Sequence, residues 1–157
     1  MACRIEITGV LPRSLGITRK ALKSAAAFFA EKSSSRVGVP FHEVSIVLQD
    51  DIGSDEAHTA VMGIRGATDV ITQRYDAMPP EEDGVYGELY VNRERAMTAF
   101  PPGRGWSAVK ELLLYVAHGM DHLSGADDLT ERERSRMRSR ELRWMKEYET
   151  RQDNLNP

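Results

Sequence analysis

Residues 108–128 read AVKELLLYVAHGMDHLSGADD, and this stretch decides how the rest of the chain is interpreted. Its first half is the most apolar part of the sequence, and Ser107 stands where its side chain can cap the first turn of a helix. Gly125 is typical of the left-handed residue that ends a helix. The stretch therefore predicts a buried helix from Ser107 to about Leu123, with polar residues gathered at its carboxyl end.

Two histidines in this stretch have the spacing of a metal site. His118 and His122 are four residues apart, so a helix directs both imidazoles to the same face. Two neutral ring nitrogens placed this way can meet one ion at about 2.0–2.1 Å each. Because the chain can turn sharply at Gly125, Asp127 or Asp128 could return to supply a third, carboxylate ligand. Two histidines and one carboxylate leave a position for water, as in catalytic zinc sites.

The same spacing has a plainer interpretation. A His-x-x-x-His pair often occurs on helices that bind no metal, and here the glycine turn and the acidic pair are what favour a metal site. A zinc protease with the common helical motif would carry a glutamate directly after the first histidine as its general base. Gly119 occupies that position, so the usual protease chemistry lacks its base.

The composition indicates one globular domain with no membrane or secretory role. The 157 residues suit a single domain, assigned to residues 1–150, followed by a flexible tail over 151–157. A net charge of -3 creates no field that attracts nucleic acid, so charge alone favours a small-molecule or protein partner. Cys3 cannot form an internal disulfide, and the first residues lack the pattern of a signal peptide, so we expect a cytoplasmic location.

Alternating and helical patterns predict four strands and five helical segments. The expected strands cover residues 3–10, 44–49, 68–72 and 85–91. The expected helices follow the caps Thr18, Ser54, Asn92, Ser107 and Thr130, and loops separate them at 33–40, 77–84 and 100–105. Thr130 and Glu133 form a capping box for a last helix that ends near Glu149. The sequence therefore predicts an α+β (mixed α/β) fold: a four-stranded mixed sheet packed against about five helices, with the metal site at the end of a central buried helix.

Three motifs together resemble one known family. Residues 118–128 are similar to the His-Gly-x-Leu-His-Leu-x-Gly-Tyr-Asp-His signature of the YbeY family. Residues 68–72, TDVIT, resemble the family's Thr-Asp-Val-Leu-Ser segment, and residues 86–89, YGEL, resemble its Leu-Gly-Asp-Ile strand. The resemblance covers residues 41–148; the long histidine motif is specific, whereas the two upstream motifs alone would be weak.

The resemblance implies a function. YbeY proteins are bacterial metal-dependent endoribonucleases linked to maturation of the 16S rRNA 3′ end and to ribosome quality control. The resemblance therefore implies a single-strand-specific, zinc-dependent endoribonuclease whose partner is the 16S rRNA precursor on the small ribosomal subunit, with no role for a membrane.

The chain departs from the family at the proposed ligands. Asp128 stands where the family has its third metal-binding histidine, while Asp127 matches the family's preceding aspartate, so the expected ligands are His118, His122 and Asp128. A carboxylate is a competent zinc ligand, but it leaves the site less positive and alters its metal preference. Asp121 replaces a family leucine; it is either an exposed helix carboxylate, the interpretation we favour, or a partner that orients a histidine.

Arginines provide the candidates for contact with RNA. The family has a functional arginine before its Thr-Asp-Val segment, and the nearest match here is Arg65, at a spacing about three residues shorter. Its guanidinium would hold a phosphodiester near the metal. The alternative, which we weigh equally, is that Arg65 is an exposed loop residue without a role in the reaction. A helical stripe could also follow an RNA backbone: Arg132, Arg136, Arg140 and Arg143.

The stripe has a second interpretation, which we favour. The glutamates interleaved with it, Glu131, Glu133 and Glu141, indicate a solvated face held by salt bridges. On the same helix, the spacing of Trp144, Met145 and Tyr148 predicts core contacts rather than stacking on bases.

Two rival functions stay open at this point. One is a non-catalytic ribosome-associated factor whose altered site binds metal weakly or not at all. The other is a zinc hydrolase or protease of another specificity, with a base that the sequence does not identify. The sequence does not determine which metal is bound, which RNA bond is cut, or the oligomeric state.

Overall fold

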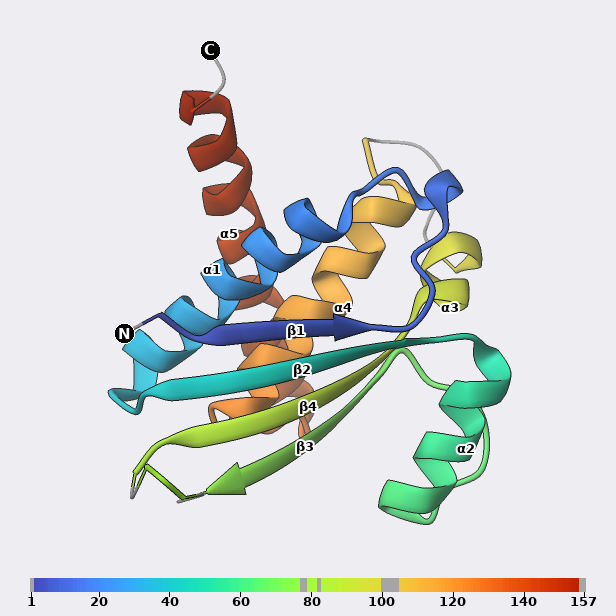
Figure 1. Ribbon diagram of the computed structural model, residues 1–157, viewed down its shortest axis with the longest axis horizontal. Helices are drawn as coiled ribbons and strands as arrows, with labels where there is room; N and C mark the ends of the chain where they lie inside the picture. Colours follow the sequence, from blue (N-terminus) through green and yellow to red (C-terminus); the bar gives the residue numbers. More distant parts are fainter. Residues whose placement is uncertain (1, 77–78, 82, 100–104, 156–157) are drawn as a thin grey trace.

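A four-stranded mixed sheet forms the front layer of the molecule (Figure 1). The computed structural model describes residues 2–76, 79–81, 83–99 and 105–155. The strands lie in the order β1-β2-β4-β3, with bounds β1 Arg4–Thr8, β2 Phe41–Gln49, β4 Val85–Asn92 and β3 Val70–Asp76. The β1–β2 and β2–β4 pairs are parallel, whereas β3 runs antiparallel to β4 at one edge.

Three long helices lie behind the sheet, and two shorter ones lie near the carboxyl ends of its parallel strands (Figure 1). The long helices are α1 Arg19–Val37, α4 Ala108–Leu123 and α5 Glu131–Leu155. The shorter ones are α2 Asp51–Met62 and α3 Arg93–Thr98, and a 3-10 turn, η1, covers Arg13–Leu15. This arrangement confirms the predicted α+β fold with a four-stranded mixed sheet and five α-helices.

The core lies between the sheet and α4. Val44, Ile46 and Leu48 of β2 are buried, as are Leu89 and Val91 of β4, because alternate residues of each strand point to the same face. On α4 nine of the twelve residues from Leu112 to Leu123 are buried, which makes it the central helix of the fold. Trp144, Met145 and Tyr148 of α5 are buried as well, which confirms the prediction that they are core residues.

Several elements have different bounds from those predicted. Helix α1 continues past Ser33 to Val37. Ser33 continues the buried face of the helix that Phe29 and Ala30 form, so the helix does not end at the serines. Helix α2 begins at Asp51, since the Asp50 carboxylate accepts a hydrogen bond from Gly53 N at 2.8 Å and caps it earlier than the predicted Ser54.

Strand β1 covers Arg4–Thr8 rather than 3–10, and β2 begins at Phe41 rather than at residue 44. Further differences concern β3 and the last helix. Strand β3 covers Val70–Asp76 rather than 68–72. Helix α5 extends to Leu155, so residues 151–155, which we expected in a tail, are helical. Of the predicted loops, residues 77–78, 82 and 100–104 lie outside the described residues. None of the helices among the described residues combines the length and the apolar character needed to cross a membrane.

Two glycines allow α4 to lie very close to β4. A Cβ atom added at Gly119 would be 2.8 Å from a Cδ atom of Leu89, and one added at Gly87 would be 2.5 Å from a Cδ atom of Leu123. Leu89 and Leu123 are themselves fully buried, so neither can move aside freely. This close approach places the carboxyl end of α4, with its histidines, directly against the sheet.

We expect Gly119→Ala to lower the free energy of unfolding by about 1–3 kcal/mol, because the added methyl group overpacks the contact with Leu89. Urea unfolding followed by circular dichroism measures the change. Ser139→Ala, at an exposed position of α5, is the control and should stay within about 0.5 kcal/mol of wild type. An unchanged midpoint for Gly119→Ala would show that Leu89 has room to adjust.

Candidate metal centre

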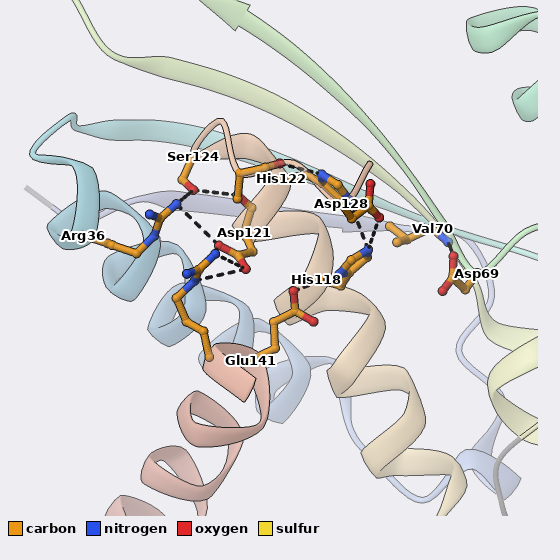
Figure 2. A network of polar contacts seen from close by, with 11 residues as sticks. Arg36, Asp69, Val70, His118, Asp121, His122, Ser124, Asp128 and Glu141 are labelled. Atoms are coloured by element: carbon orange, nitrogen blue, oxygen red, sulfur yellow. Dashed lines mark hydrogen bonds and ion pairs between the residues drawn. The ribbon is translucent and has the colours of Figure 1, made fainter. Parts of the chain in front are cut away.

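The three predicted ligands converge at the carboxyl end of α4 (Figure 2). His118 and His122 lie one helical turn apart, and their Nε2 atoms are 3.1 Å from each other. The Asp128 Oδ2 atom is 3.6 Å from His118 Nε2 and 3.3 Å from His122 Nε2. Three potential ligand atoms therefore form a nearly equilateral triangle.

The triangle has the size that a small divalent cation requires. A tetrahedral ion with bonds of about 2.1 Å places its ligand atoms about 3.4 Å apart, close to the three separations seen here. The side chains of His118, His122 and Asp128 are 21%, 24% and 38% exposed, so the site is open to solvent on one side. Three protein ligands with access for water fit a catalytic zinc-type site better than a closed structural one.

Both imidazoles are held by their second ring nitrogen. His118 Nδ1 lies 2.8 Å from Glu141 Oε2, and His122 Nδ1 lies 3.0 Å from the carbonyl oxygen of Ala126. Because carboxylate and carbonyl oxygens only accept hydrogen bonds, each neutral ring carries its proton on Nδ1. The Nε2 lone pairs are therefore free to meet an ion at the centre of the triangle.

The chain between α4 and α5 brings Asp128 back to the histidines. Gly125 has a φ of 95°, the left-handed conformation that the sequence predicted for it. Beyond the turn, Arg134 donates a hydrogen bond from Nη1 to the carbonyl oxygen of Asp128 at 3.1 Å. Thr130 and Glu133 form the predicted capping box, with reciprocal bonds of 3.2 and 3.1 Å at the start of α5.

Burial and nearby carboxylates act in opposite directions on His118. Burial lowers the pKa of His118, but the hydrogen bond and charge of Glu141, together with Asp69 and Asp128, outweigh it, so the pKa is above its ordinary value. Burial raises the pKa of Glu141, which the contact with His118 opposes and the neighbouring Asp121 reinforces. A metal ion that bound here would have to displace a proton from His118, and that proton is held more tightly than the proton of a free histidine.

Asp121 is buried, contrary to the exposed position that we favoured from the sequence. Its side chain is 0% exposed and accepts three hydrogen bonds from Arg140, at 3.0, 3.2 and 3.0 Å. Arg36 of α1 also approaches it, with Nη2 3.6 Å from Asp121 Oδ1. The direct partner that orients a histidine is Glu141, not Asp121.

The arginine stripe of α5 is only partly the solvated face that we expected. Arg132, Arg136 and Arg143 are exposed, but the Arg140 side chain is 18% exposed and binds Asp121. Glu141, which we placed on the solvated face, is fully buried. Its position has a signal in the sequence, since it lies at helical spacing among the buried residues Met137, Trp144, Met145 and Tyr148.

Arg65 is not joined to the ligands. It is exposed on the turn that follows α2, and within the described part of the chain no hydrogen bond or ion pair connects it with His118, His122 or Asp128. The turn itself is held to α2, because Gly66 N donates to Asp55 Oδ1 at 2.6 Å. Arg65 therefore remains a prediction from the resemblance.

Comparison with known proteins agrees with the motifs. The sequence pattern of the family described as "Endoribonuclease YbeY" matches residues 14–149. A protein of that name from Syntrophomonas wolfei is 33% identical over 114 residues, which covers 68% of this chain and 72% of the relative. One from Rhodopirellula baltica is 42% identical over 80 residues, which covers 50% of this chain and 40% of the relative.

A solved structure shares the fold. A protein from Thermotoga maritima, determined in solution, superimposes with a TM-score of 0.57 over 96% of this chain and 93% of the other, at 24% sequence identity. The match of the family pattern to most of the chain, the curated relatives and the three motifs lead to one conclusion. This chain belongs to the endoribonuclease YbeY family.

Proposed function

We propose that this protein is a divalent-metal-dependent endoribonuclease that cuts single-stranded RNA, with His118, His122 and Asp128 as the metal ligands and zinc as the metal. The observation that carries the proposal is the triangle of Nε2, Nε2 and Oδ2 atoms, 3.1–3.6 Å apart, with both Nδ1 atoms already engaged. The curated relatives bear the name endoribonuclease, which supports RNA as the substrate.

The residues of the chain prepare the site for hydrolysis. A bound divalent ion would supply Lewis acidity, which makes water more acidic and withdraws charge from a phosphodiester. Glu141 and the Ala126 carbonyl hold the imidazoles in place, so that no rearrangement of the ligands is needed when the ion binds. The partial exposure of the three side chains leaves the centre of the triangle accessible from solvent.

We further propose that Arg65 contacts the phosphate being cleaved. A guanidinium matches phosphate oxygens with two parallel hydrogen bonds and adds charge where it develops in the transition state. Its exposed position on the turn after α2 leaves it free to engage a substrate.

The proposed physiological substrate is the 3′ end of the 16S rRNA precursor on the small ribosomal subunit, in the cytoplasm. This assignment rests on the family resemblance. With a net charge of -3, the chain has no general attraction for nucleic acid, so recognition would depend on local arginines and on the ribosomal context.

The packing around Gly119 bears on the protease alternative. A side chain at this position, where the usual protease motif has its glutamate, would push against Leu89, because a Cβ atom there meets it at 2.8 Å. The protease alternative would therefore need a general base from elsewhere in the chain. The non-catalytic alternative is favoured only by the change of the third ligand to Asp128, which still completes the triangle.

We expect His118→Ala to abolish cleavage of a single-stranded RNA oligonucleotide, because it removes one ligand and the partner of Glu141. A chelator should abolish wild-type cleavage, and added zinc should restore it. His42→Ala, a histidine of β2 bonded to the Asp83 carbonyl, is the matched control and should cleave normally. Equal cleavage by wild type and His118→Ala would identify a contaminating nuclease and remove the support for the proposal.

Two adjacent aspartates allow a direct test of the third ligand. We expect Asp128→Ala to weaken zinc binding by more than about 100-fold, since changes outside the ligand shell alone cost about 10- to 100-fold. Asp127→Ala, at the exposed neighbouring position, should bind zinc as wild type does. Competition with a chromophoric chelator gives both affinities, and the opposite ranking would transfer the ligand role to Asp127.

The role of Arg65 predicts a defect in turnover without a defect in metal binding. We expect Arg65→Ala to lower kcat for RNA cleavage by about 100-fold, the size typical of losing one group that stabilises transition-state charge. Zinc affinity should be unchanged. Arg132→Ala, an exposed arginine of α5, serves as the control for general loss of positive charge. An equal loss of kcat in the two variants would show that Arg65 contributes only general positive charge.

A further inference from the structure

Two polar bridges cross the interface between α4 and α5 side by side (Figure 2). His118 and Asp121 are three residues apart on α4, and each binds one of two adjacent residues of α5. Glu141 binds His118, with 2.8 Å between Oε2 and Nδ1, and Arg140 binds Asp121 through its Nε and Nη2 atoms. One bridge reaches a metal ligand, and the other does not.

The two carboxylates of these bridges lie close to each other. Asp121 and Glu141 are both 0% exposed, and burial and the charge of Asp121 raise the pKa of Glu141. Glu141 Oε1 is buried and has no hydrogen-bond partner among the described residues. Glu141 Oε1 is thus an unused acceptor on the residue next to Arg140 in α5. Arg140 itself makes three hydrogen bonds to Asp121 and, among the described residues, none to Glu141.

A third element fixes Asp121 in this position. Arg36 of α1 donates to Ser124 Oγ at 2.5 Å, and Ser124 Oγ donates to the Asp121 carbonyl at 2.6 Å. The Arg36 guanidinium also lies 3.6 Å from the Asp121 carboxylate. Two cations thus compensate one buried anion, which leaves no unpaired charge on Asp121 itself.

We propose that Asp121 is a positioning residue for the metal centre: it retains the Arg140 guanidinium and so leaves the Glu141 carboxylate to His118. A guanidinium that is only 18% exposed and has lost Asp121 would turn to a carboxylate with an unused oxygen, because an unpaired and largely desolvated charge is costly. That carboxylate is Glu141, and its departure would release His118 Nδ1. The proposal deepens the proposed function, since it concerns the same metal site.

The effect of Arg140 on the contact between Glu141 and His118 should depend on whether Asp121 is present. If Arg140 is harmful only when Asp121 is missing, removing both should restore the bond between Glu141 and His118. Leucine is the family residue at position 121, which makes Asp121→Leu/Arg140→Leu a reasonable apolar replacement of the pair. Substitution of a buried ion pair by apolar residues of similar volume is commonly tolerated.

The experiment compares wild type with Asp121→Leu, Arg140→Leu and the double variant. Asp121→Asn, which removes the charge and keeps the shape, is included in case Asp121→Leu does not fold. Arg143→Leu is the matched control, since Arg143 is an arginine of α5 whose side chain is 63% exposed. Thermal unfolding establishes that each variant is folded. Two further measurements follow: zinc affinity by chelator competition, and the tautomer of His118 in the metal-free protein by nitrogen-15 NMR at alkaline pH.

In wild type, the double variant and Arg143→Leu, we expect His118 to carry its proton on Nδ1 and zinc affinities to agree within about threefold. In folded Asp121→Leu or Asp121→Asn, we expect a mixture of tautomers and a loss of zinc affinity of about 10-fold or more, the size seen when an outer-shell partner is removed. Recovery in the double variant distinguishes positioning from a general loss of packing.

Either of two results overturns the proposal: a folded Asp121 variant that keeps both the tautomer and the zinc affinity, or a double variant as defective as Asp121→Leu. The tautomer measurement needs neither zinc nor RNA. A wild type that binds no zinc would therefore refute the proposed function, while the same ordering of tautomers across the variants would still support the positioning role of Asp121.

Discussion

The hydrogen bonds from the two Nδ1 atoms are the constraint on which the metal centre depends. An imidazole can present a lone pair to an ion only from the nitrogen that carries no proton, so the partner of the other nitrogen determines its use. Glu141 and the Ala126 carbonyl place both protons on Nδ1 and leave both Nε2 atoms 3.1 Å apart. The close contact of α4 with β4 at Gly119 and Gly87 then fixes the helix that carries both rings.

Burying the groups that hold His118 has a cost that the surrounding helices offset only in part, since Glu141 Oε1 has no hydrogen-bond partner among the described residues. Glu141 and Asp121 are both removed from water, which disfavours their charged forms. Arg140 and Arg36 compensate Asp121, and His118 contributes a hydrogen bond to Glu141. The polar contacts that link α1, α4 and α5 are therefore the same contacts that surround the proposed metal ligands, so the stability of the fold and the geometry of this site are coupled.

The sequence was sufficient for the elements that local chemistry determines. The caps at Thr18, Asn92, Ser107 and Thr130 and the turn at Gly125 act within a few residues, and the structure has all of them. The side chains of the three proposed ligands lie together, as the sequence predicted, because helical spacing and one tight turn act over short distances along the chain.

Contacts between distant helices could not be predicted in the same way. Glu141 lies in a run of arginines and glutamates, so its charge suggested a solvated face, although its spacing from Trp144 and Tyr148 placed it on the buried side of α5. Asp121 was misplaced for a related reason. Its burial depends on Arg36 and Arg140, which lie 85 and 19 residues away along the chain, and no local pattern connects them.

Asp128, the proposed third ligand, stands where the resemblance places a histidine, and its charge is compatible with the surrounding network. Asp128 brings a negative charge to a region where Glu141 and Asp69 already act on His118, and a carboxylate there favours the protonated ring when no metal is bound. A divalent cation reverses that preference, since its charge is attracted by the same carboxylates and its bonds require the neutral imidazoles. Arg140 and Arg36 already neutralise Asp121. The carboxylates left to attract an ion are therefore the ones that act on His118, namely Glu141, Asp69 and Asp128. If the site binds a divalent cation as proposed, binding would replace the proton of His118 with the ion.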